Sequence, residues 1–276
     1  MRFRLFALLT ICGFATFALT MTFVPLLPVW ANYAVRIGFL VVFGALWLVA
    51  RDGNKLNRFR PVFFAYFTAV FSLSLGFFFA DRGLELLGLT TQTPMGIAMA
   101  KFLQASLIVI GILAVATLSG QNLASLYIRK GRLILGLGVG LIVAAALAFL
   151  SLRQPAVMAL GTAKLISLAP WIALFVISNA FMEELLFRGL FLGRYEPLIG
   201  KWLAILSTAL AFTLAHMQVT YAPQMAVFLL VTFIFSIAWG WLTQKTNSLW
   251  GSVLFHAGAD LLIIIPIFSS LGAVRG

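Results

Sequence analysis

Long runs of apolar residues recur along the whole chain and are separated by short polar segments. Each run approaches or exceeds the roughly 20 helical residues that cross a hydrocarbon core of about 30 Å. Backbone groups inside a bilayer must be hydrogen-bonded within the protein, and continuous rather than alternating apolar runs favour helices over a barrel. The pattern therefore predicts nine spanning helices, at about 5–24, 33–50, 61–80, 96–118, 132–150, 168–190, 202–220, 225–242 and 248–268.

The composition strengthens this interpretation. Hydrophobic residues make up 63% of the chain and charged residues 9%, whereas an ordinary soluble domain has roughly 25% charged residues. We therefore expect one membrane domain, an all-α polytopic bundle of eight to nine transmembrane helices around an intramembrane polar cavity. Within it, residues 1–160 carry N-terminal helices without a recognised motif, and residues 165–268 carry the polar motifs described below.

The net charge is +12, but the lysines and arginines are scattered between apolar runs. This distribution argues against a nucleic acid partner and favours anionic lipid head groups. The loops 51–60 and 129–132 are the most basic, and the positive-inside rule assigns them to the cytoplasm. The N-terminus then lies inside, and with nine spans the C-terminus lies outside. The first apolar run exceeds a usual signal-peptide core and is followed by Pro25 and Pro28, so we expect a retained anchor.

The segment Gly136-Leu-Gly-Val-Gly140 opens one of the predicted spans. A glycine-rich loop can bind a nucleotide phosphate, but this segment follows the basic loop 129–132 and continues as an apolar helix. We favour close helix packing through small residues four apart.

The placement of the acidic residues and the two histidines carries most of the functional information. Four acidic residues fall in loops or at span ends: Asp52, Asp81, Glu85 and Glu196. The remaining five ionisable residues of this set fall inside apolar spans: Glu183, Glu184, His216, His256 and Asp260. An ionisable group near the bilayer centre costs about 2.5–3.5 kcal/mol on insertion scales, so each is a candidate site residue.

The spacing of the two glutamates suggests different partners. Glu184 precedes Arg188 by four residues, the favourable order for a helical ion pair. Glu183 is about 100° further round an α-helix and can face something else. The Glu184–Arg188 pair alone is more often structural than catalytic.

The two histidines add what hydrolysis requires. His256 and Asp260 are one helical turn apart and can share a face. If each span is a continuous helix, then Glu183, His216 and His256 lie nearer the middle of their spans than the ends and can meet in one cavity. A lone His216 is more often a helix-packing residue. Together, a carboxylate pair and two histidines supply a base for water and a donor for an oxyanion.

Three motifs occur in order within these spans. They are EExxxR at Glu183–Arg188, FxxxH at Phe212–His216 and HxxxN/D at His256–Asp260. This trio resembles the CAAX protease and bacteriocin-processing family of intramembrane proteases, which includes the type II CAAX prenyl endopeptidases. The resemblance covers roughly residues 165–268, and the first five spans carry no matching motif.

The resemblance implies roles for the residues of the first two motifs. Glu183 would activate the attacking water, and His216 would help to bind it. Glu184 and Arg188 would support the geometry of the carboxylate, with Phe212 as the supporting residue of the second motif.

The third motif and the metal leave alternatives open. His256 and Asp260 would polarise the scissile carbonyl and stabilise its oxyanion, but the CAAX endopeptidases have Asn where this chain has Asp260, and an ionised Asp cannot donate. Asp260 is then protonated, orients His256 or helps to bind a metal. A divalent metal such as zinc could be held by Glu183, His216 and His256. The chain lacks His-Glu-x-x-His, and a metal-free glutamate mechanism explains the same residues.

The predicted function is therefore cleavage of a membrane-associated protein or peptide by an integral protein of a bacterial inner membrane. An ion- or proton-coupled transporter could use the same residues as a relay, but it predicts discontinuous helices and polar groups reaching both faces. A non-catalytic scaffold or immunity protein could keep them for architecture. The residues do not identify the substrate or show whether it is prenylated.

Overall fold

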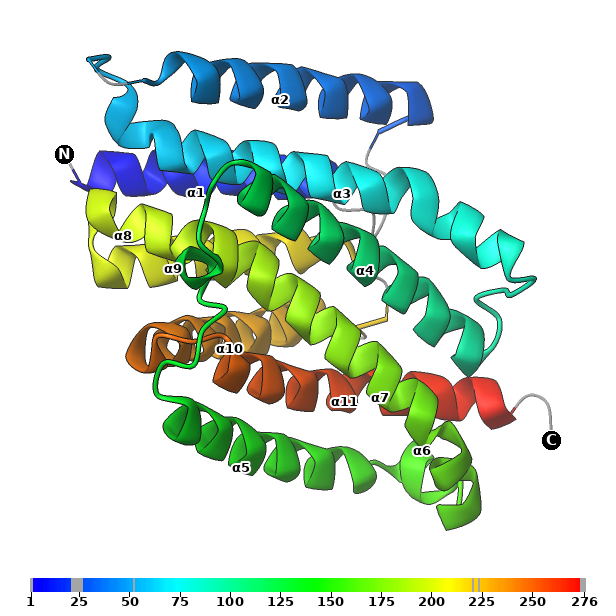
Figure 1. Cartoon of the computed structure of the whole chain (residues 1–276). Coiled ribbons are helices and arrows are strands. Elements are labelled where there is room, and N and C mark those ends of the chain that lie inside the picture. Colours follow the sequence, from blue (N-terminus) through cyan, green and yellow to red (C-terminus); the bar gives the residue numbers. More distant parts are fainter. Residues whose placement is uncertain (1, 21–26, 52, 220, 223, 274–276) are drawn as a thin grey trace. The chain divides into compact units, whose positions relative to one another are not determined.

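The computed structural model describes residues 2–20, 27–51, 53–219, 221–222 and 224–273, and these contain helices and no β-strand (Figure 1). The predicted all-α class is therefore confirmed. Asp52, Pro25 and residues 21–24 of the first predicted span lie outside the described residues.

The described part of the chain holds eight helical segments that are long and apolar enough to cross a membrane, and one shorter apolar helix, α9 (Lys201–Ala215). The predicted count of eight to nine is confirmed. The long helices are α1 (Arg2–Thr20), α2 (Val29–Val49), α3 (Arg60–Leu86), α4 (Pro94–Leu118), α5 (Leu133–Leu152), α7 (Thr162–Glu184), α10 (Met225–Thr246) and α11 (Trp250–Ala273). The short elements are η1 (Asn57–Phe59), η2 (Leu123–Leu126), α6 (Pro155–Met158), the π-helix η3 (Leu185–Leu192), α8 (Gly193–Ile199) and η4 (His216–Gln218).

The chain folds into two compact units whose segments alternate along the sequence. Unit 1 consists of Met1–Ser74, Ile110–Tyr127 and Leu185–Trp241. Unit 2 consists of Leu75–Val109, Ile128–Glu184 and Leu242–Gly276. The separation of residues 1–160 from residues 165–268 stays a prediction about motifs.

In unit 1, α9 packs along α1. The Thr10 hydroxyl donates a hydrogen bond to the Ser207 hydroxyl at 2.9 Å. A methyl group at Gly13 would lie only 3.3 Å from the Ala211 side chain, so the two helices approach closely there. The contact fixes the helix that leads directly to His216.

In unit 2, α11 packs against both α5 and α7 (Figure 1). Glycine makes the α5 contact possible, because a methyl group at Gly140 would lie 2.6 Å from the backbone oxygen of Gly251. A methyl group at Gly258 would likewise lie 2.5 Å from the Ala144 Cα atom. The predicted packing through small residues is confirmed, and it sets the position of the helix that carries His256.

The end of α5 and the residue that caps α6 compensate for a proline in α11. Pro266 has no N–H group, so the carbonyl oxygen of Leu262, four residues earlier, lacks its helical donor. The Gln154 side chain donates to this oxygen at 3.1 Å, and the Ser151 hydroxyl donates to the neighbouring oxygen of Leu261 at 2.8 Å. These bonds satisfy backbone groups that lipid could not.

The basic loop 129–132 meets the turn between α10 and α11. The Arg132 backbone N–H donates to the Thr246 oxygen at 2.7 Å, and the Ser248 hydroxyl donates to the Arg129 oxygen at 2.8 Å. Lys245 immediately precedes this turn. The loop 129–132 and the turn that follows Lys245 therefore lie side by side.

Candidate active site

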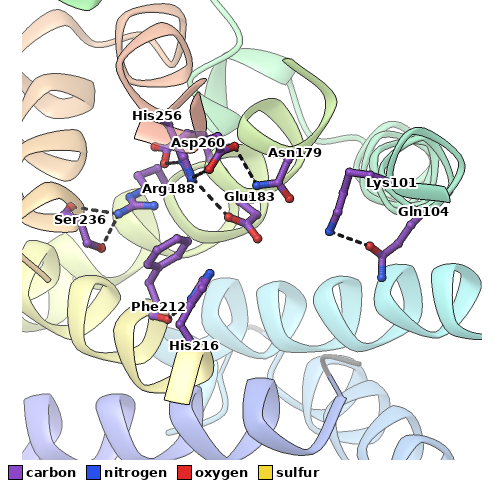
Figure 2. Close-up of polar contacts among 11 residues, drawn as sticks. Lys101, Gln104, Asn179, Glu183, Arg188, Phe212, His216, Ser236, His256 and Asp260 are labelled. Carbon is purple, nitrogen blue, oxygen red and sulfur yellow. Dashed lines mark hydrogen bonds and ion pairs between the residues drawn. The ribbon is translucent and has the colours of Figure 1, made fainter. Parts of the chain in front are cut away.

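Four of the predicted site residues meet where the end of α7 packs against α11: Glu183, Glu184, His256 and Asp260 (Figure 2). The first three are exposed by only 1%, 0% and 2%, and Asp260 by 8%. Charges withdrawn from water to this degree are stable only when protein groups pair with them. The arrangement of the charges is therefore the main feature of the site.

The imidazole of His256 lies between the two glutamates. Its Nδ1 atom is 2.9 Å from Glu184 Oε1, and its Nε2 atom is 3.4 Å from Glu183 Oε2 and 3.7 Å from Asp260 Oδ1. A doubly protonated ring can donate toward carboxylates on both sides. The prediction that His256 and Asp260 share a helix face is confirmed.

Glu183 and Glu184 share His256 as one partner, which the sequence did not predict. Although their Cα–Cβ bonds diverge around the helix, both side chains reach the same ring, each at a different nitrogen. A glutamate has enough rotatable bonds to overcome the angular separation of neighbouring helical positions.

Asn179 was not identified from the sequence, although it belongs to this cluster. It lies on α7 one turn before Glu183, is 7% exposed, and its Nδ2 atom donates to Asp260 Oδ2 at 3.0 Å. Asparagine is neutral, so it is not among the ionisable residues that marked the site in the sequence. The four-residue spacing to Glu183 is the signal that could have found it.

Lys101 was also missed. It lies on α4 within the predicted span 96–118, donates to Gln104 Oε1 at 3.0 Å, and its ammonium lies 5.8 Å from the centre of the Phe175 ring. The ammonium also interacts electrostatically with Glu183 and Asp260. A lysine inside an apolar run was the available signal, and it gives the cluster a positive charge besides His256.

His216 lies at the end of α9, in η4. The prediction that it lies in the middle of a continuous helix over 202–220 is wrong, because α9 ends at Ala215. The last four carbonyl oxygens of a helix lack helical donors, and the Phe212 oxygen is one of them. His216 Nδ1 lies 2.8 Å from this oxygen. Since a carbonyl only accepts, Nδ1 carries the hydrogen and the neutral ring keeps a lone pair on Nε2.

Arg188 lies fully buried in the π-helix η3 of unit 1. Its Nη2 atom donates to the Ser236 hydroxyl at 2.6 Å and to the Ser236 backbone oxygen at 3.0 Å. The guanidinium carbon also lies 5.0 Å from the centre of the Phe212 ring and 5.3 Å from that of Trp239. The arginine thus fixes the surroundings of the second motif, and its ion pair with Glu184 stays a prediction.

The π-helix itself corrects the sequence interpretation. A continuous α-helix was predicted over 168–190, but α7 ends at Glu184 and π-type turns follow from Leu185 to Leu192. Such turns are rare and are often found at functional sites. Rules of α-helical spacing therefore do not apply directly beyond Glu184.

The predicted metal donors were compared with the groups of side chains that the structure brings together. Among the residues that the structure describes, no group of three or more His, Cys, Asp or Glu side chains is placed to hold a metal ion. The set considered from the sequence was Glu183, His216 and His256, but both ring nitrogens of His256 face carboxylates as hydrogen-bonding or ion-pair partners. A metal-bound and a metal-free mechanism therefore both stay predictions.

Comparison with known proteins identifies the segment that carries the motifs. Residues 165–262 match the family model described as type II CAAX prenyl endopeptidase Rce1-like. All three motifs fall inside the matched segment. No curated protein and no solved structure matches the chain.

Proposed function

We propose that this multi-pass membrane protein is an intramembrane endopeptidase, because residues 165–262 match the family model described as type II CAAX prenyl endopeptidase Rce1-like. It hydrolyses a peptide bond of a membrane-associated protein or peptide, using a water molecule activated by Glu183. The observation that supports this proposal best is the buried cluster in which two adjacent glutamates approach opposite nitrogens of His256.

Glu183 acts as the general base in the proposed reaction. It takes one proton from water as the water oxygen attacks the scissile carbonyl carbon. The resemblance to the family implies that His216 helps to bind the water, and its Nε2 atom is the acceptor for this role, since Nδ1 of that ring is engaged with the Phe212 oxygen. By taking this proton, Glu183 orients a lone pair of the water toward the substrate.

His256 stabilises the negative charge that develops on the carbonyl oxygen. In the resting cluster its Nε2 atom is directed toward Glu183 at 3.4 Å, longer than an ideal charge-assisted hydrogen bond. When Glu183 becomes protonated, its attraction for the Nε2 hydrogen falls, and the N–H group becomes available as a donor to the oxyanion without rotation of the ring. Proton uptake by the base and stabilisation of the intermediate are therefore coupled.

Collapse of the tetrahedral intermediate completes the reaction. The carbon–nitrogen bond breaks, and Glu183 gives its proton to the departing amine. Glu184 keeps the His256 ring oriented through the 2.9 Å bond to Nδ1, as a buried carboxylate does for a catalytic histidine. Arg188 supports the site by holding the π-helix and the ring of Phe212.

We also propose the setting in which the enzyme works. The basic loops 51–60 and 129–132 face the cytoplasm of a bacterial cell, and the protein lies in the inner membrane. The substrate is a peptide held at the membrane. Its sequence and any lipid modification are to be determined by comparing the peptides of membranes with and without the active protein.

The test of the function replaces Glu183 by alanine and follows cleavage of a membrane-associated reporter. Cleavage should be lost while expression and membrane insertion stay unchanged. The matched control is Glu85→Ala, which removes an exposed acidic residue near the end of α3. This variant should cleave the reporter as the wild type does. Full cleavage by the Glu183→Ala variant would refute the proposal.

A further inference from the structure

The pair formed by Asn179 and Asp260 points to a role that the motifs do not contain. Position 260 of α11 carries a carboxylate, and the neighbouring helix α7 carries an amide, where Asn179 Nδ2 donates to Asp260 Oδ2 at 3.0 Å (Figure 2). We propose that Asn179 is a positioning residue of the hydrolytic site, which orients Asp260 and, through it, His256. This inference rests on the proposed function.

The two oxygens of the Asp260 carboxylate have different neighbours. Oδ2 accepts the hydrogen bond from Asn179, while Oδ1 lies 3.7 Å from His256 Nε2. Fixing one oxygen by a directional bond restricts rotation of the whole planar carboxylate. The amide therefore determines where the second oxygen lies relative to the ring nitrogen that is to serve the oxyanion.

The contact between α7 and α11 repeats at an interval of one helical turn. Asn179 precedes Glu183 by four residues, and Asp260 follows His256 by four residues. The contacts Glu183–His256 and Asn179–Asp260 are thus two successive cross-links between the helices. The second cross-link maintains the register on which the first depends.

Charge and burial explain why this position requires an amide. Asn179 is 7% exposed and Asp260 is 8% exposed, so bulk water cannot readily replace the donor. Three carboxylates already share the cluster, and an acidic side chain at position 179 would add a fourth. An apolar side chain there would leave Asp260 Oδ2 without its hydrogen bond.

An exchange of the two side chains tests the inference. Wild type, Asn179→Asp, Asn179→Leu and the double variant Asn179→Asp/Asp260→Asn are reconstituted in liposomes with a peptide whose cleavage depends on Glu183. Each single variant should lower kcat by about 100-fold with little change in KM, the upper range for residues that orient others. The double variant restores one amide and one carboxylate, so its kcat should be at least about tenfold higher than that of Asn179→Asp.

Ser178→Ala is the matched control on α7. In the described part of the chain, the Ser178 hydroxyl donates to the backbone oxygens of Leu174 and Phe175 in its own helix. It should retain the wild-type kcat. Wild-type kcat in both Asn179 variants, or a double variant as slow as Asn179→Asp, would overturn the inference.

A second measurement does not require activity. The chain has two histidines, so His216→Gln leaves His256 as the only source of imidazole ¹⁵N signals. Asn179→Asp should move these signals, and the double variant should return them toward the wild-type positions. If Glu183-dependent cleavage were absent altogether, the proposed function would fail while this measurement still tested the pair. If cleavage depended on Glu183 but neither kcat nor the signals responded, only the positioning role would fail.

Discussion

The end of α9 and the second turn of α11 each present one histidine, and the two have opposite surroundings. His216 has its Nδ1 atom on a backbone oxygen at the end of a helix, so its other nitrogen is an acceptor in the neutral ring. His256 lies inside a helix with carboxylates near both nitrogens, so its ring is surrounded by acceptors. The ring of His216 is thus prepared to accept a hydrogen bond, and the ring of His256 is prepared to donate one.

This difference shows that the role of a histidine follows from its partners rather than from its motif. In the proposed reaction the acceptor ring binds water and the donor ring binds the oxyanion. When two residues of the same type have environments that favour different protonation states, one commonly acts as an acid or donor and the other as a base or acceptor. Substitutions that remove or change one environment should therefore have unequal effects.

Of the two histidine substitutions, the one that removes the donor ring is expected to have the larger effect. His256→Gln should lower kcat by about 1,000-fold, because loss of one oxyanion donor costs on the order of 10²–10³ and the carboxylates also lose their shared partner. The measurement is kcat in liposomes, with a thermal unfolding curve as the control for folding. A kcat within tenfold of the wild type in a folded variant would contradict the donor role.

A smaller loss is expected at the acceptor ring. His216→Gln should lower kcat by about 100-fold, the lower range for assistance by a general base, since Glu183 still takes the proton. A lower kcat for His216→Gln than for His256→Gln under the same conditions would contradict the proposed roles of the two rings.

The sequence predicted the helices well where long apolar runs determine them. It also predicted the packing of Gly140 and the shared face of His256 and Asp260, because both depend on the regular spacing of an α-helix. These features are local and need no knowledge of which helices become neighbours.

The remaining features of the site depend on helix ends and on tertiary contacts. The apolar run around His216 continues past Ala215, where α9 ends, so hydrophobicity did not mark the end of the helix. The π-type turns after Glu184 have no period that an apolar pattern reveals. Asn179 is neutral, and its importance appears only when α11 brings Asp260 within 3.0 Å.

A weaker effect should come from the helix packing that positions the donor ring. Gly140→Leu would insert a side chain where a methyl group already lies 2.6 Å from the Gly251 oxygen, so α5 and α11 must separate. We expect a loss of about 1–3 kcal/mol in the free energy of unfolding and a parallel fall in activity. The control is Gly138→Leu, since a methyl group at Gly138 meets no atom within 4 Å. Equal stability of the two variants would argue against this contact.

No effect is expected from removal of divalent metals. Both ring nitrogens of His256 face carboxylates, and the proposed base is Glu183 itself. Treatment of the reconstituted protein with a membrane-permeant chelator, followed by metal analysis and a cleavage assay, should leave kcat unchanged. Loss of activity that added zinc restores would show that a metal takes part.

The most direct test of hydrolysis by the buried cluster compares the wild type with Glu183→Gln, both purified and reconstituted in liposomes with a quenched fluorescent peptide. Glutamine keeps the size of the side chain but cannot take a proton from water. We predict that the wild type produces two peptide fragments identifiable by mass spectrometry and that the folded variant produces none. Equal fragment yields from the two proteins would contradict the assignment of Glu183 as the base.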